Sequence, residues 1–242
     1  MAQETKPAGS LDDAFAALKT YDWGSDIRAL DPIDKAIESA QGKAAEWKPL
    51  ENRLAPVLKA GVPRAAKEFV CRKLALIGSA QSVPVLASLL NDEELGHMAR
   101  YALERIPGPE ADKALRDALP KATGKNRIGI INSIGVRRDA AGAARLAAQL
   151  SDQDAEVAAA AAIALGEVGS PEAAKALEGY RKRAPKEFRN VAADASLACA
   201  ERLLRRGRKD EALAIFRELG AEGQPAHIKS AAKRALSEAT HA

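Results

Sequence analysis

The chain has 242 residues, of which 47% are hydrophobic, 29% charged and only 4% aromatic. This length and composition exclude a disordered tail and a mini-protein. Strands draw on aromatic and β-branched residues, whereas the apolar fraction here is mostly alanine and leucine, so the sequence favours an all-α fold.

Charge and cysteine content narrow the function classes. Lysine and arginine number 37 against 33 aspartates and glutamates, and the net charge of +4 permits nucleic-acid binding without indicating it. Cys71 and Cys199 lie 128 positions apart and form no Cys-x-x-Cys motif, so thiol redox chemistry is not expected. The longest uncharged stretch, residues 74–91, contains several polar side chains and is predicted as two buried helix segments joined by a turn, not as a membrane span.

The N-terminal residues carry a signal about the compartment. Met1 to Pro7 contain no apolar run and therefore no signal peptide. The residues after Met1 nevertheless resemble those that follow a signal-peptide cleavage site. We therefore leave the compartment open and favour export, periplasmic or extracellular, over a cytoplasmic location if this N-terminus is a processed one. Residues 1–9 are expected to be a disordered segment.

Residues 10–62 are predicted to be an N-terminal helical cap. Ser10 precedes an amphipathic segment as a helix N-cap, and Asp31 stands before Pro32 in the same way. Further helices are expected near 32–41 and 44–60. Both tryptophans of the chain lie in this region, and the terminal units of helical repeats are atypical because one face meets solvent.

From residue 63 the sequence repeats itself. The segment from Leu90 to Leu119 matches the segment from Leu150 to Lys182 at an offset of 62, which indicates two units of about 31 residues each. Apolar positions recur in two ladders, Leu86, Leu115, Leu146 and Leu177 in the first and Leu74, Leu103, Ile131 and Leu165 in the second. Each unit is therefore predicted to be two helices that bury their apolar faces by stacking on neighbouring pairs. Residues 63–242 are expected to form about five such pairs in an α-α superhelix, or solenoid.

Capping residues agree with these boundaries. Asp92, and Asp152 or Asp154, stand just before the second helix of their units, and Ser170 stands before Pro171 at the start of another helix. Five glycines are expected at helix ends: Gly61, Gly78, Gly135, Gly169 and Gly207.

The segment 150–173, with Leu-Ser-Asp-Gln-Asp-Ala-Glu-Val followed by Ala-Leu-Gly-Glu-Val-Gly-Ser-Pro-Glu-Ala, resembles a HEAT repeat of the short, phycobilisome-lyase-like kind. The resemblance covers roughly residues 63–205. The arginine that often follows the valine in this family is Ala158 here, which interrupts the usual polar ladder. Exported HEAT-repeat proteins of environmental bacteria without an assigned activity are similar in the combination of four motifs, Tyr21-Asp-Trp-Gly, Phe69-Val-Cys-Arg, Arg100-Tyr-Ala-Leu-Glu-Arg-Ile-Pro and Asn132-Ser-Ile-Gly-Val-Arg-Arg-Asp. The resemblance implies an α-solenoid and leaves scaffold, DNA-repair and lyase roles open.

Candidate residues for chemistry are few. The histidines, His97, His227 and His241, have no metal-ligand spacing, and neighbouring acidic residues such as Glu93 and Glu94 fit first helical turns. We therefore predict no catalytic residues, no metal site and no cofactor. The densest basic cluster lies at 181–209, where phosphate binding competes with a structural explanation, since cations complement the C-terminal ends of helices.

Polar residues on successive second helices form the candidate partner-binding site: Arg100, Glu104, Arg127, Asn132, Arg137 and Arg138. Stacking would align them into a stripe on the concave surface, where they could bind an extended partner through charge-assisted hydrogen bonds. The alternative is pairing between helices, such as Arg105 with Glu110 or Asp139.

The sequence therefore predicts a non-enzymatic protein-protein interaction scaffold that acts as a monomer and has an unidentified protein partner. Two alternatives stay open. One is nucleic-acid binding through the basic surface around 181–209, and the other is a lyase-type HEAT enzyme without identifiable catalytic residues.

Overall fold

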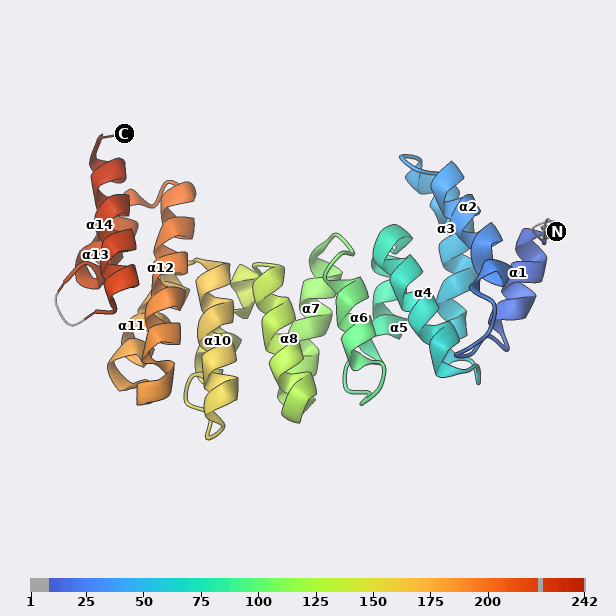
Figure 1. Ribbon diagram of the computed structural model, residues 1–242, viewed down its shortest axis with the longest axis horizontal. Helices are drawn as coiled ribbons and strands as arrows, with labels where there is room; N and C mark the ends of the chain where they lie inside the picture. The colour runs from blue at the N-terminus through green and yellow to red at the C-terminus, as the bar shows by residue number, and fades with distance from the viewer. Residues whose placement is uncertain (1–8, 222–223, 242) are drawn as a thin grey trace, which may run out of the picture. The chain divides into compact units, whose positions relative to one another are not determined.

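The computed structural model describes residues 9–221 and 224–241, and these residues form helices and turns without a strand (Figure 1). The predicted all-α fold class is confirmed. The predicted disordered segment, 1–9, lies outside the described residues except for Gly9. The chain divides into two compact units, an N-terminal unit (residues 1–114) and a C-terminal unit (residues 115–242), and the boundary in the sequence falls within α7 (Pro109–Ala118). In the described part of the chain, no helix combines the length and apolar character needed to cross a membrane.

The N-terminal unit begins with the predicted cap. Its helices are α1 (Leu11–Leu18), α2 (Asp31–Ser39), α3 (Ala44–Leu54), α4 (Arg64–Ile77), α5 (Val83–Ala87) and α6 (Gly96–Leu103), with short 3-10 turns at Ile27–Leu30, Ala55–Lys59 and Ala80–Ser82. Helix α1 packs on α2, α3 packs on α4, and α4 and α5 both pack on α6. The cap helices near 32–41 and 44–60 are thus present, the second of them ending as a 3-10 turn.

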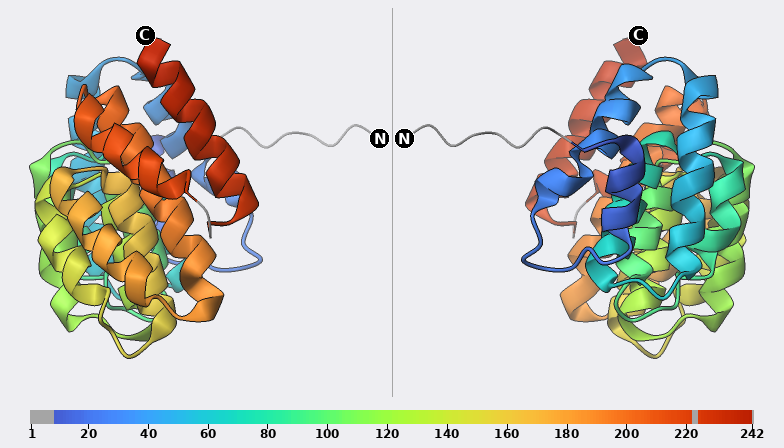
Figure 2. Two further views of the ribbon diagram at one scale, coloured as in Figure 1. Left: turned by 90° about the vertical axis from the view of Figure 1, so that its left-hand side faces the viewer. Right: turned by 90° about the vertical axis from the view of Figure 1, so that its right-hand side faces the viewer.

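The C-terminal unit is a stack of helix pairs. It contains α8 (Gly124–Val136), α9 (Ala143–Gln149), α10 (Ala155–Val168), α11 (Pro171–Arg183), α12 (Arg189–Arg205), α13 (Lys209–Leu219) and α14 (Ala226–His241), with 3-10 turns at Leu119–Lys121, Ala140–Gly142 and Lys186–Phe188. The second helices α8, α10 and α12 lie side by side in one row, α9 packs on α11, and α14 packs on α12 and α13 at the end of the unit (Figures 1 and 2). The predicted HEAT-like stacking is confirmed in this unit.

The two apolar ladders form the core. Leu86, Leu115, Leu146 and Leu177 on the first helices, and Leu74, Leu103, Ile131 and Leu165 on the second helices, are all buried. Full burial of such a side chain contributes roughly 1.5–3 kcal/mol, so the ladders supply much of the free energy of folding. The run Ala158 to Ala162 is buried as well, because α10 packs between α8 and α12.

Most predicted caps are confirmed, with two corrections. Asp154 and Ser170 are side-chain N-caps of α10 and α11, and Asp92 accepts the backbone N–H groups of Glu94 and Leu95 before α6. The N-cap prediction for Asp31 is wrong: this residue is the first of α2, because a 3-10 turn runs directly into the helix. Gly135 lies inside α8 instead of at its end, for a packing reason given below.

Candidate partner-binding surface

The row of second helices is held together by small residues. A Cβ atom at Gly135 of α8 would lie 2.8 Å from the Cα atom of Ala164 in α10, and one at Gly166 of α10 would lie 2.7 Å from the carbonyl oxygen of Ala195 in α12. The two contacts are 31 residues apart in the sequence on both sides, Gly135 to Gly166 and Ala164 to Ala195. Residues 31 apart are therefore structurally equivalent in α8, α10 and α12. Gly135 is thus a packing glycine that allows two helix backbones to approach closely.

Two repeat positions on the second helices lie at the surface. The first position holds Tyr101, Asn132, Ile163 and Asp194, and the second, four residues later, holds Arg105, Val136, Glu167 and Ala198. The matching residues of α4 are Arg72 and Leu76. Residues four apart share one face of a helix, so α4, α8, α10 and α12 each present both positions on the same side, while Arg105 lies just past the end of α6.

Exposed apolar side chains concentrate at these two positions. Leu76 (59% exposed), Tyr101 (38%), Val136 (58%) and Ile163 (51%) are four of the six large exposed hydrophobic residues in the described part of the chain; the others, Trp23 and Ile27, lie in the cap. Single exposed apolar residues are ordinary, but their recurrence at equivalent positions defines an apolar surface in each unit. We call the α8–α10 part, formed by Val136 and Ile163, the apolar strip.

In the N-terminal unit this surface carries an aromatic and a cation. The guanidinium of Arg105 lies 3.7 Å from the centre of the Tyr101 ring, and its Nη1 donates a hydrogen bond to the Tyr101 carbonyl oxygen (2.9 Å). The pairing of Arg105 with Glu110 or Asp139, the alternative drawn from the sequence, is wrong. Its ion pair is with Glu104 (4.0 Å), and Asp139 pairs with Arg116 instead.

The six predicted partner-binding residues are divided between the units. Arg100 and Glu104 lie in the N-terminal unit, and Arg127, Asn132, Arg137 and Arg138 lie in the C-terminal unit. Burial lowers the pKa of Arg100, which is only partly exposed, while the carboxylate of Glu104 opposes this shift. A common stripe of all six residues stays a prediction.

Within the C-terminal unit the predicted residues differ in their surroundings. Arg127 is tied to the turn before α10, since its Nη2 lies 2.6 Å from the Asp152 carboxylate and its Nε donates to Gln149 Oε1 (3.0 Å). Asn132 is exposed at the first repeat position, Arg137 is half-buried at the end of α8, and Arg138 is exposed. Asn132 and Arg138 therefore lie within reach of a partner, whereas Arg127 has a structural contact.

Sequence reasoning missed the apolar residues of this surface. Tyr101 and Ile163 lie two residues before the buried Leu103 and Leu165, and Val136 lies two residues after the buried Ile134. A strict 31-residue alignment, which puts Ile134 in place of Ile131 in the second ladder, would have placed all three on the opposite face. The prediction instead grouped Arg100 with Asn132, although the residue equivalent to Asn132 is Tyr101.

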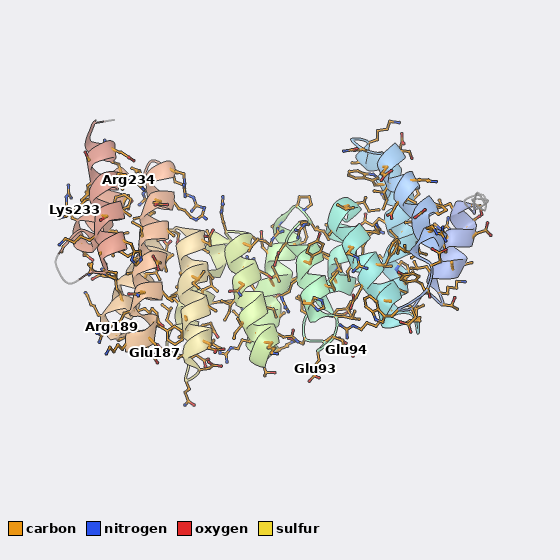
Figure 3. The ribbon with its side chains drawn as sticks, viewed as in Figure 1. Glu93, Glu94, Glu187, Arg189, Lys233 and Arg234 are labelled. Carbon is orange, nitrogen blue, oxygen red and sulfur yellow. The ribbon has the colours of Figure 1, made fainter. Side chains whose placement is uncertain are left out.

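The basic cluster at 181–209 is largely used by the fold. Arg181 pairs with Glu218, Arg202 with Glu167 and Arg208 with Glu211, while Arg206 Nη1 donates to the carbonyl oxygen of Gly169 (2.9 Å). Arg189 lies at the start of α12, away from Lys233 and Arg234 on α14 (Figure 3). The positive charge of this unit is therefore spread over several elements.

A cleft of about 240 Å³ lies between α11 and α13, with Ser196 and Cys199 of α12 among its lining residues. Its lining carboxylates are paired, Glu178 with Lys182, Glu211 with Arg208 and Glu218 with Arg181. Burial raises the pKa of the Cys199 thiol to about 12, so this thiol is protonated at neutral pH. The cleft therefore presents no activated nucleophile.

Comparison with known proteins supports the repeats. Residues 121–198 match the family model described as HEAT repeats. No curated protein matches the chain. Among solved structures, an engineered protein is 20% identical (TM-score 0.47; 94% of this chain and 67% of that one covered), and human deoxyhypusine hydroxylase in complex with glycerol is 15% identical (TM-score 0.39; 96% of both chains covered).

Proposed function

Residues 121–198 match HEAT repeats, and from that premise we propose that the chain is a non-enzymatic scaffold that binds a protein partner through the exposed face of its second helices. The observation that carries this proposal is the recurrence of Leu76, Tyr101, Val136 and Ile163 at two equivalent repeat positions. Within each unit, apolar or aromatic side chains at equivalent positions of neighbouring helices supply the buried centre that protein interfaces need.

Protein is a better partner than nucleic acid for this surface. Phosphates require cations that are available to them, whereas much of the positive charge at 181–209 pairs with carboxylates or caps a helix. Among the four exposed apolar residues only Tyr101 is aromatic, and a single ring does not form a stacking platform for successive bases. A mainly aliphatic surface instead fits the apolar side chains of a polypeptide.

The proposal is tested by affinity purification of the tagged chain from separated cytoplasmic and exported fractions of native cells. We expect a protein to co-purify with the unmodified chain and its recovery to fall at least about tenfold with Ile163→Asp, because an interface centre does not accept an unpaired charge. The fraction that yields the partner also tests export. Arg100→Glu combined with Arg137→Glu tests the predicted polar stripe in the same assay.

Ile27→Asp is the matched control. Ile27 is 49% exposed, close to the value for Ile163, but it lies in the cap and outside the repeat positions. Both variants should keep the melting temperature of the unmodified chain, since neither charge is buried. Equal recovery of the partner by both variants would remove the second-helix face from consideration.

A further inference from the structure

The second helices of the C-terminal unit end at different levels. Helices α8 and α10 end at Val136 and Val168, whereas α12 continues to Arg205. Ala198 of α12 is the equivalent of Val136, so α12 runs seven residues, about 10 Å, past that level (Figure 1). In this extension Arg202 pairs with Glu167, and Arg206 donates to the carbonyl oxygen of Gly169. The extension of α12 therefore covers the end of α10.

Arg138 and Gly169 are equivalent residues with the same unusual backbone. They are 31 positions apart, follow α8 and α10 respectively, and have left-handed φ values of 54° and 57°. At Gly169 a side chain is excluded, because a Cβ atom would lie 2.4 Å from the Cβ atom of Arg202. After α8 the equivalent position is exposed, so it accommodates the long cationic side chain of Arg138.

The backbone conformation of Arg138 is unfavourable for an arginine. A left-handed conformation brings the Cβ atom of an L-residue close to the following carbonyl oxygen, and glycine avoids that cost. The Arg138 side chain forms no hydrogen bond or ion pair with another described residue that would offset it. A strained residue whose side chain gives nothing to the fold is a candidate for a role in binding.

The surroundings of Arg138 define the chemistry of a ligand. Val136 is two residues away, and Ile163 precedes Ala164, which packs against Gly135. Arg205 ends α12 two turns beyond Ala198 and is also exposed, while the nearby carboxylate of Glu167 is neutralised by Arg202. The exposed carboxylates of Asp194 and Glu201 lie on α12, so a carboxylate of a ligand is favoured beside Arg138 and not along α12.

We propose that the apolar strip and Arg138 together bind an acidic segment of the protein partner, with apolar side chains on Val136 and Ile163 and a carboxylate on Arg138. This inference rests on the proposed scaffold function and adds the chemical class of the partner. Charge complementarity carries it, since the strip ends on α8 at the exposed cation of Arg138, where a carboxylate forms charge-assisted hydrogen bonds.

The test selects a displayed library of random 12-residue peptides on the immobilised full chain at low salt. We expect the enriched peptides to combine Leu, Ile, Val or Phe with at least two acidic residues. A synthetic copy of an enriched peptide should lose affinity as salt rises, because exposed charge pairs are screened. Enrichment of peptides without acidic residues, or no enrichment, overturns the proposal.

Two variants at Arg138 separate binding from stability. Arg138→Gly should weaken the peptide about fivefold or more while raising the melting temperature, because it removes the cation and the strain together. Arg138→Lys should retain most of the affinity. Unchanged affinity in Arg138→Gly overturns the proposal; if Ile163→Asp still abolishes binding, the scaffold function stands. If peptide binding is insensitive to Arg138→Gly and to Ile163→Asp, the acidic-segment proposal and the scaffold proposal are both contradicted. If oligonucleotides compete with the peptide, the surface around Arg138 is a nucleic-acid site instead.

Discussion

In the C-terminal unit α10 packs against α8 and α12 through glycine and alanine, whereas in the N-terminal unit a buried carboxylate joins α3 to the turn before α5. The Glu51 side chain is buried, and its Oε1 accepts hydrogen bonds from the Ser79 backbone N–H (2.8 Å) and the Ser82 hydroxyl (2.6 Å). Gly135 and Gly166 have no such polar partner and work by being small.

The difference shows two solutions to the same stacking problem. Where the repeat is regular, close approach of backbones buries a continuous alanine surface, and the helices are interchangeable modules. Near the cap the spacing changes to 29 residues, and a specific polar contact fixes one helix against one turn. The regular unit should therefore be sensitive to side-chain volume, and the cap-proximal unit to the loss of hydrogen bonds.

The largest expected effect comes from adding volume at Gly166. In Gly166→Val the new Cβ atom would lie 2.7 Å from the Ala195 carbonyl oxygen, which belongs to the backbone and cannot turn away. We expect a loss of about 3 kcal/mol or more in the free energy of unfolding, at the upper end for overpacked cores. Urea denaturation followed by circular dichroism measures it.

Gly179→Ala is the matched control for this prediction. Gly179 lies in α11, and the nearest atom to an added Cβ is a flexible arginine nitrogen at 3.6 Å, so the change should stabilise the helix by roughly 0.5–1 kcal/mol. The buried thiols of Cys71 in α4 and Cys199 in α12 report where the damage falls. Gly166→Val should speed alkylation of Cys199 more than that of Cys71, and the reverse result would contradict this packing role.

The next largest effect is expected at Glu51. Glu51→Ala leaves the donors of Ser79 and Ser82 without their acceptor, and a buried donor such as the Ser82 hydroxyl costs about 1–3 kcal/mol when unpaired, whereas Ser79 is exposed to water. Glu51→Gln keeps an acceptor oxygen and should cost less. Here the alkylation rate of Cys71 should rise more than that of Cys199. Equal destabilisation by alanine and glutamine would show that the side chain acts by volume and not by its hydrogen bonds.

The helix pairs and the buried ladders were predictable because they depend on patterns within one repeat. Leu165 and Leu177 recur with their turns, and caps such as Ser170 are local signals. The start of α2 was misjudged because a 3-10 turn precedes it without a break, which the Asp31-Pro32 pair does not reveal. Gly135 was misjudged because its role is set by Ala164 on another helix.

The candidate surface was harder to predict than the fold. Polar residues were chosen as the site because charge is visible in a sequence, whereas the exposure of Val136 and Ile163 depends on which side of a helix its neighbours cover. Arg127 illustrates the opposite error, since its contact with Asp152 exists only once α8 lies beside the turn before α10. Arginine is not a residue type that indicates a left-handed backbone, so the conformation of Arg138 could be found only in the structure.

The smallest expected effect compares the two units at a helix start. Ser170→Ala removes a buried N-cap whose Oγ accepts from the Ala173 N–H (3.2 Å), and we expect a loss of about 1 kcal/mol. Ser10→Ala removes an exposed capping box with Asp13 and should cost less, because water can replace it.

Acid titration distinguishes these two caps. The hydrogen bonds from Ser10 lower the pKa of Asp13 below 3.8, so their stabilisation is present above that pH and is lost as the pH falls through the lowered value. The cost of Ser10→Ala should therefore shrink with acid. The cost of Ser170→Ala should shrink only in part, because its bond to the Ala173 N–H does not titrate, although Ser170 contributes, after the Glu172 backbone N–H, to the lowered pKa of the Glu172 carboxyl group. Thermal unfolding of both variants across this pH range measures the difference. A cost of Ser10→Ala that does not change with acid would mean that Asp13 takes no part in the exposed cap.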